Sequence, residues 1–222
     1  MRVVLGIFTA GGLIIALALS IGVARDQARP PTPATSATVA PARCGSADGP
    51  VTLALPPAAF AERVEGAWAR VENWLVSNAP ATAAAWNRPA TTAELITLQR
   101  DLGSPLPSEL VITLTRHNGA RADGFTLPPS YRLMSAGEIL TTAVAMCEEG
   151  TDWRAGDVPF AKDDKGVIYL RGGGLYRYPT GHRYAGNLVE LVERAADRLE
   201  GGSESDYRPD VDALGTLRWV HE

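Results

Sequence analysis

Three observations in the sequence predict an α+β domain. Runs with helical periodicity dominate the first part of residues 51–222, runs with strand character follow in the second part, and residues 29–50 contain almost no large apolar side chain. Helices first and hairpin strands later favour an α+β arrangement over a doubly wound parallel sheet. Residues 51–222 are long enough to form one domain with its own core.

An uncharged apolar run, residues 3–24, lies ahead of that domain. About 20 apolar residues suffice to cross a bilayer as a helix. Gly22 and Ala24 also provide the small residues that precede a signal-peptidase cleavage site. Residues 1–28 are therefore either a removed signal peptide or a membrane anchor. The run exceeds the roughly 7–15 apolar residues usual for a signal peptide, which favours the anchor.

Residues 29–50 are rich in Pro, Ala, Thr and Ser. Such a segment buries too little apolar surface to offset its ordering entropy, so we expect an extended tether. An apolar helix followed by this kind of tether is typical of an exported domain. We expect the domain to be extracytoplasmic, held at the cell membrane by a single span through residues 3–24, or secreted. A cytosolic protein with a hydrophobic tail is the alternative.

The charge and the cysteines narrow the classes of partner. A formal net charge of −4 and a pI of about 5.5 argue against a nucleic-acid partner, which usually requires a basic stripe. Cys44 and Cys147 lie far apart without a neighbouring ligand pattern, so we expect no metal site. In an exported chain they could form a disulfide that holds the tether against the domain. Two unrelated thiols are the alternative.

Helices are expected at the start of the domain. Phe60, Val64, Trp68, Val71 and Leu75 recur at helical spacing and predict a helix over residues 57–78 whose apolar stripe faces the core.

Two shorter helices are expected within residues 91–119. Thr91 with Glu94 forms a capping box for the first, and the second starts near Pro107. Asn118 and Gly119 close this stretch with a turn. It carries no catalytic set and is interpreted as architecture.

Strands and two further capped helices are expected in the rest of the domain. Ser135 with Glu138 forms a second capping box. The apolar positions of its helix are Ile139, Leu140, Val144 and Met146. Residues 167–170 and 175–178 have strand character and are joined by glycines at 172–174, which favours a hairpin. Asn187 caps a helix that ends at Gly201, and residues 215–220 form a closing strand.

Motifs for enzymatic chemistry are mostly missing from the sequence. His117, His182 and His221 lie in no metalloprotease or metal-site spacing. There is no nucleophile elbow, and the glycines after Arg171 lack a phosphate-loop spacing. Asp157, Asp163 and Asp164 could act as an acid/base pair or hold a hard cation. Turn formation is the favoured interpretation of these three carboxylates.

A series of short motifs occurs between residues 60 and 220. In chain order they are Trp68 with Trp74-Leu75, Arg88-Pro89-Ala90-Thr91, Leu102-Gly103, Leu106-Pro107-Ser108-Glu109-Leu110, His117-Asn118-Gly119, Trp153, Val158-Pro159-Phe160-Ala161, Asp163-Asp164 with Gly166, and Gly215-Thr216-Leu217-Arg218-Trp219. Their order and spacing resemble the SUKH superfamily, named for the Smi/Knr cell-wall-assembly regulators and bacterial immunity proteins. The apolar run and tether depart from most members.

The resemblance implies a mixed, largely antiparallel sheet with helices packed against it. It also implies a non-enzymatic protein-binding module, because bacterial members are typically immunity proteins that bind and block toxins, and others resemble cell-wall-assembly adaptors. We therefore expect an immunity-like or cell-wall-associated adaptor without a cofactor. Its partner would be a toxin or a cell-wall-associated protein.

The acidic loop 148–164 is the candidate partner surface. Its candidate residues are Trp153, Asp157, Asp163 and Asp164. Acidic side chains steer a basic partner and an aromatic side chain anchors it. The alternative function is an acid/base or metal-assisted hydrolase of the cell envelope that uses the carboxylates of this loop.

Overall fold

The computed structural model of this chain describes residues 49, 51–54, 56–149, 152–202 and 206–222. The predicted membrane segment at residues 3–24 and nearly all of the predicted tether lie outside these residues. None of the helices in the described part is long and apolar enough to cross a membrane.

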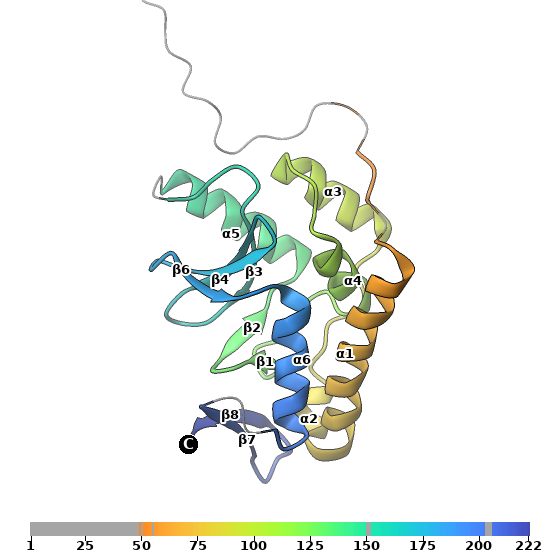
Figure 1. Ribbon diagram of the computed structural model, residues 1–222, viewed down its shortest axis with the longest axis vertical. Helices are drawn as coiled ribbons and strands as arrows, with labels where there is room; N and C mark the ends of the chain where they lie inside the picture. Colours follow the sequence, from red (N-terminus) through yellow and green to blue (C-terminus); the bar gives the residue numbers. More distant parts are fainter. Residues whose placement is uncertain (1–48, 50, 55, 150–151, 203–205) are drawn as a thin grey trace, which may run out of the picture. The chain divides into compact units, whose positions relative to one another are not determined.

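The described residues form an α+β domain, as the sequence predicts (Figure 1). The helices are α1 (Ala58–Asn78), α2 (Pro80–Ala83), α3 (Thr92–Leu102), α4 (Ser108–Arg116), α5 (Ala136–Glu148) and α6 (Leu188–Leu199). The strands are β1 (Thr126–Leu127), β2 (Tyr131–Leu133), β3 (Val158–Lys162), β4 (Val167–Arg171), β5 (Gly174–Tyr178), β6 (His182–Ala185), β7 (Tyr207–Val211) and β8 (Leu217–His221).

The strands pair as a meander and a separate hairpin. β1 to β6 form one sheet in sequential order, and β7 pairs with β8. Every strand pair among the described residues is antiparallel. The expectation of a largely antiparallel sheet is therefore confirmed, and the expected parallel pairs are not found among these strands. The predicted glycine turn is present between β4 and β5, where Gly172 and Gly173 both adopt positive φ. That geometry suits a tight hairpin turn and is easily reached only without a Cβ.

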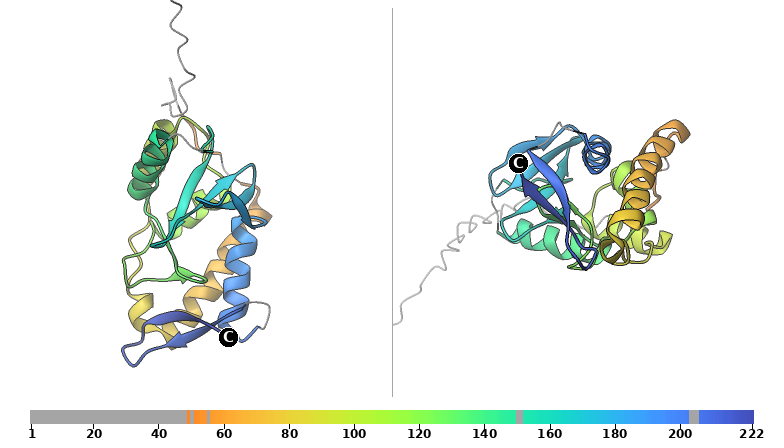
Figure 2. Two further views of the ribbon diagram at one scale, coloured as in Figure 1. Left: turned by 90° about the vertical axis from the view of Figure 1, so that its left-hand side faces the viewer. Right: turned by 90° about the horizontal axis from the view of Figure 1, so that it is seen from below.

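The core forms where α1, α4 and α6 meet the sheet. α1 and α6 run side by side, with the β7–β8 hairpin at the C-terminal end of α6 (Figures 1 and 2). Trp68 on α1 is fully buried, and its indole N–H donates to the Thr113 hydroxyl of α4 at 3.0 Å. The predicted apolar stripe of the first helix therefore faces the core, with Val64, Trp68, Val71 and Leu75 buried.

The helix starts follow the predicted caps. Thr91 begins α3 and Ser135 begins α5, each with both hydrogen bonds of a capping box. Asn187 begins α6 by accepting from the Glu190 amide at 2.8 Å. The predicted turn at Gly119 is present with φ of 73°, and a Cβ there would lie 2.5 Å from the Met134 backbone. This close approach admits only glycine.

One predicted core position is wrong. Val144, expected on the apolar face of α5, is 44% exposed, whereas Ala143 and Cys147 are buried beside it. The buried face of α5 therefore passes through Ala143 and Cys147, not through Val144. This face packs against α3 and β3.

A carboxylate links α1 to the end of α4. Glu72 accepts from Arg116 and lies 2.7 Å from the His117 ring, which stacks on Trp86 with centroids 4.1 Å apart. Burial of the Glu72 carboxylate by itself raises its pKa. The hydrogen bonds from His117 and Arg116 outweigh this effect and hold the pKa at about 2.

We expect this pairing to make the domain acid-sensitive. The folded pKa of Glu72 lies below its ordinary value of 4.5, so its stabilisation is complete above that pH and is lost as the pH falls toward 2. At neutral pH, Glu72→Gln should lower the free energy of unfolding by about 1–2 kcal/mol, allowing for solvent screening. It should also flatten the decline below pH 4.5. Thermal unfolding of both proteins at a series of pH values measures this, and parallel pH profiles would contradict it.

Candidate functional site

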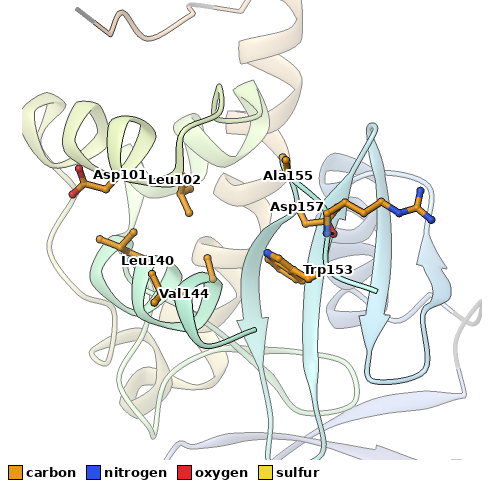
Figure 3. Close-up of a pocket in the computed structure, with 10 residues that line it drawn as sticks. Asp101, Leu102, Leu140, Val144, Trp153, Ala155 and Asp157 are labelled. Atoms are coloured by element: carbon orange, nitrogen blue, oxygen red, sulfur yellow. The ribbon is translucent and has the colours of Figure 1, made fainter. Parts of the chain in front are cut away.

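The sequence-predicted residues Trp153 and Asp157 line a small pocket between α3, α5 and the segment before β3 (Figure 3). Figure 3 shows Leu140 and Val144 of α5 across the pocket from Trp153. The pocket encloses about 30 Å³. A buried water needs roughly 10–15 Å³ on this measure, so the pocket has room for two or three waters and for no larger ligand.

Asp157 is fully committed to an internal ion pair. Its side chain is 1% exposed and accepts from Arg171 Nε at 2.7 Å and from the Arg154 amide at 2.7 Å. The hydrogen bonds that Arg171 donates to Asp157 raise the pKa of Arg171, whose guanidinium also lies 5.0 Å from the Tyr169 ring centroid. The carboxylate therefore fixes the turn before β3 and is not accessible to a partner or a substrate.

Trp153 is also a packing residue. It is 8% exposed and lies against Tyr169 with ring centroids 5.2 Å apart. Its cluster includes Cys147, which is not a free thiol; Cys44 lies outside the described residues, so the disulfide between them stays a prediction. The indole covers the end of α5, which leaves little of it for a partner to contact.

Asp163 and Asp164 lie in the turn between β3 and β4, as the turn interpretation predicts. Asp163 accepts from the Lys165 amide at 2.8 Å and from the Ser130 hydroxyl at 3.1 Å, and Asp164 is exposed. The structure therefore does not bring Asp157 together with this pair. Among the described residues, no group of three or more His, Cys, Asp or Glu could hold a metal ion.

We expect Asp157 to be a stability residue. Asp157→Ala leaves the half-buried Arg171 without its counter-charge and should lower the free energy of unfolding by about 2–4 kcal/mol. The matched variant Asp164→Ala, on the exposed turn, should change it by less than about 0.5 kcal/mol. Chemical denaturation of both variants measures the difference, and equal stabilities would contradict this assignment.

A far larger depression lies along α6, and we call it the α6 groove. Its lining residues are Pro128, Pro129, Tyr131, Arg177, Tyr184, Ala185, Leu191, Arg194, Ala195, Asp197, Arg198, Glu200, Gly202, Asp206 and Tyr207. Its volume is about 920 Å³, at the upper end of the roughly 300–1,000 Å³ of ligand sites. They come from the β1–β2 turn, strands β2, β5 and β6, helix α6, the segment that follows α6, and strand β7, and these labelled elements can be followed in Figure 1.

Two tyrosines and an arginine form the sheet side of the groove. Tyr131 and Tyr184 meet edge to face with centroids 5.5 Å apart, and the Arg177 guanidinium lies 5.7 Å from the Tyr131 ring centroid. The Tyr184 hydroxyl donates to the Pro128 carbonyl, which links β6 to the turn after β1 and curls the sheet.

Two polar atoms on this side find no hydrogen-bond partner among the described residues. The Tyr131 hydroxyl and Arg177 Nε are buried and have no hydrogen bond of good geometry. Burial raises the pKa of Tyr131, as does the nearby Asp163 carboxylate, whereas Arg177 opposes the rise. Burial also raises the pKa of Tyr184. Such orphaned groups are rare in folded proteins and often mark functional positions.

The helix side of the groove presents one face of α6. Leu191, Arg194, Ala195 and Arg198 recur at helical spacing and lie on this face. Arg198 is 7% exposed and donates to the carbonyls of Tyr207 and Gly202 and to the Glu222 carboxylate. It thereby holds the β7–β8 hairpin as the far wall of the groove.

None of the functional residues predicted from the sequence lines this groove. Tyr131 and Tyr184 lie in short strands that the sequence analysis did not identify, and Arg194 reads as an ordinary solvated residue of an amphipathic helix. Asp163 is the one predicted residue near the groove, through its electrostatic effect on both tyrosines. Tyr131 of β2 and Tyr184 of β6 meet only because the sheet curls, and no local pattern in the sequence indicates that contact.

No family model matches the chain, and no curated protein matches it either.

We expect the Tyr131 hydroxyl to cost stability in the unliganded protein. An unsatisfied buried polar group costs about 1–3 kcal/mol, so Tyr131→Phe should raise the free energy of unfolding by about 1 kcal/mol. Tyr184→Phe, which removes the bond to Pro128, should lower it by a similar amount. Thermal denaturation compares the two variants, and a destabilised Tyr131→Phe protein would show that the hydroxyl is satisfied.

Proposed function

We propose that this chain is a non-enzymatic protein-binding module of the SUKH type, exported or anchored at the membrane through residues 3–24. It acts as an immunity-like or cell-wall-associated adaptor. The observation that carries the proposal is the α6 groove, an open depression with unsatisfied polar side chains that the domain itself does not use.

The placement of the SUKH-like motifs supports the proposal. Pro107 and Ser108 begin α4, Phe160 and Ala161 are buried in β3, and Trp219 of β8 donates to the Thr126 carbonyl at 2.7 Å. These residues start a helix, fill the core or hydrogen-bond to another strand, so their roles are structural. The motifs thus behave as a shared scaffold, and the partner surface lies elsewhere.

The partner surface is the α6 groove in place of the acidic loop. Trp153 and Asp157 are buried, whereas Arg194 and Asp206 are exposed on the groove and Tyr184 is partly exposed. Tyrosine and arginine are the side chains most enriched at the energetic centres of protein interfaces. The groove concentrates them around a depression, which is where such centres form.

The alternative, a hydrolase using the acidic loop, has less support. Asp157 is neutralised by Arg171, and Asp163 is held in its turn by Ser130 and Lys165. A general acid or base must be within hydrogen-bond reach of a substrate proton. The side chain of Asp157 is only 1% exposed, so its carboxylate is not within hydrogen-bond reach of a substrate.

Site-specific photo-crosslinking tests the proposal in the cells that make the protein. A photoreactive residue replaces Arg194 or Asp206, one at a time, in the full chain. We expect each to trap the same protein partner, because both side chains are exposed on the groove. Mass spectrometry of the trapped product identifies it.

The matched control positions are Val76 and Leu214, which are 68% and 81% exposed and do not line the groove. They should give no specific product. Products at the control positions alone, or at none of the four positions, would contradict the groove as the partner surface.

A further inference from the structure

The α6 groove contains a half-buried arginine, Arg177, without a counter-charge among the described residues. Arg177 is half-buried, its Nε is buried without an acceptor, and it forms no ion pair with any described carboxylate. Burying an arginine without a partner is costly unless a carboxylate or phosphate pairs with it in the functional state. Among the described residues, the groove therefore has no anion paired with Arg177.

The other charges of the lining do not supply that anion. Arg198 pairs with Glu222, and Asp197 and Glu200 both pair with Arg70 on α1. Asp206 is exposed at the rim and forms no ion pair with Arg177 among the described residues. Arg194, also exposed, adds a second cation without a partner in the described part of the chain.

The length of the groove sets the size of its occupant. Its lining on α6 runs from Leu191 to Glu200, nine residue steps. At 1.5 Å per residue this is about 13–14 Å. An extended peptide rises about 3.3 Å per residue, so roughly four residues fill that length.

The remaining walls suit a peptide backbone and small side chains. Leu191, Ala195 and Ala185 give apolar contact, and Pro128 and Pro129 form a rigid rim opposite α6. The two tyrosines present flat rings, which contact a main chain at low cost in side-chain entropy. This combination of apolar walls and an unpaired, half-buried arginine suits the recognition of a short acidic motif.

We infer that the α6 groove binds an extended segment of about four residues from a partner protein, anchored by an Asp or Glu side chain on Arg177. The inference rests on the proposed function and names the chemistry that the groove selects. Arg194 lies on the same helix face as Ala195 and adds attraction for the acidic segment at the groove entrance.

Peptide selection on the full chain tests this. The protein is kept in mild detergent, immobilised through an N-terminal tag, and offered two phage-displayed random hexapeptide libraries. One library is embedded in the coat protein and has no free C-terminus, and the other ends in a free carboxylate. We expect the embedded library to yield peptides with Asp or Glu at one fixed position.

The selected peptide is then made with both ends capped. Replacing its acidic residue by Gln or Asn, or using the R177Q protein, should weaken binding about tenfold or more, the worth of one charge-assisted hydrogen bond. The matched protein control is R208Q, since Arg208 is an exposed arginine on β7 outside the groove. Binding to it should be unchanged.

Three outcomes would overturn the inference. Embedded-library peptides without a fixed acid, or equal binding by R177Q and the unsubstituted protein, would remove the Arg177 anchor. Selection from the free-ended library alone would assign the carboxylate to a chain terminus. No selection from either library would remove the peptide itself. A partner trapped at Arg194 and Asp206 would leave the proposed function standing in each case, which separates the two failures.

Discussion

The arrangement of this domain depends on the burial of one helix. α6 carries eight buried residues along its whole length, seven apolar residues and Arg198, and the apolar ones include Leu188, Val192 and Leu199. It packs on α1, on the curled sheet and on β7 at once, so apolar surface is removed from water on several sides. A helix covered this way leaves only a narrow strip uncovered. That strip is the helix side of the α6 groove, so the same packing that stabilises the domain also shapes its largest depression.

The sequence predicts the helices well because their signals are local. Thr91, Ser135 and Asn187 each sit within three residues of the group they cap, so no distant contact is needed to identify them. The β4–β5 hairpin is equally local. Strands β2, β3, β6 and β7 escape prediction because they are short, carry Pro159 and Pro209, or are buried on both faces. Their existence depends on pairing across the sheet, which a single sequence does not encode in its periodicity.

The candidate site is the least predictable part for a related reason. A tryptophan among acidic residues suggests a binding surface. In the fold, however, Trp153 packs in a buried cluster with Tyr169 and Cys147, and only tertiary packing brings these residues together. Asp157 likewise acquires its partner from Arg171, fourteen positions later. Conversely, Tyr131, Arg177 and Tyr184 are unremarkable in sequence and become a cluster when the sheet curls. Local polarity is a poor guide to function where an ion pair or an aromatic contact can bury the same side chains.

The last strand described here has a consequence for how the chain reaches its native state. The Leu217 amide of β8 donates to the Thr82 hydroxyl at 2.8 Å, and Trp219 closes over Thr126. Contacts between such distant parts of the chain form late, because closing a long loop precedes any gain from the contact. During synthesis β8 emerges after every other described element, so these two contacts form only once the other described helices and strands are available.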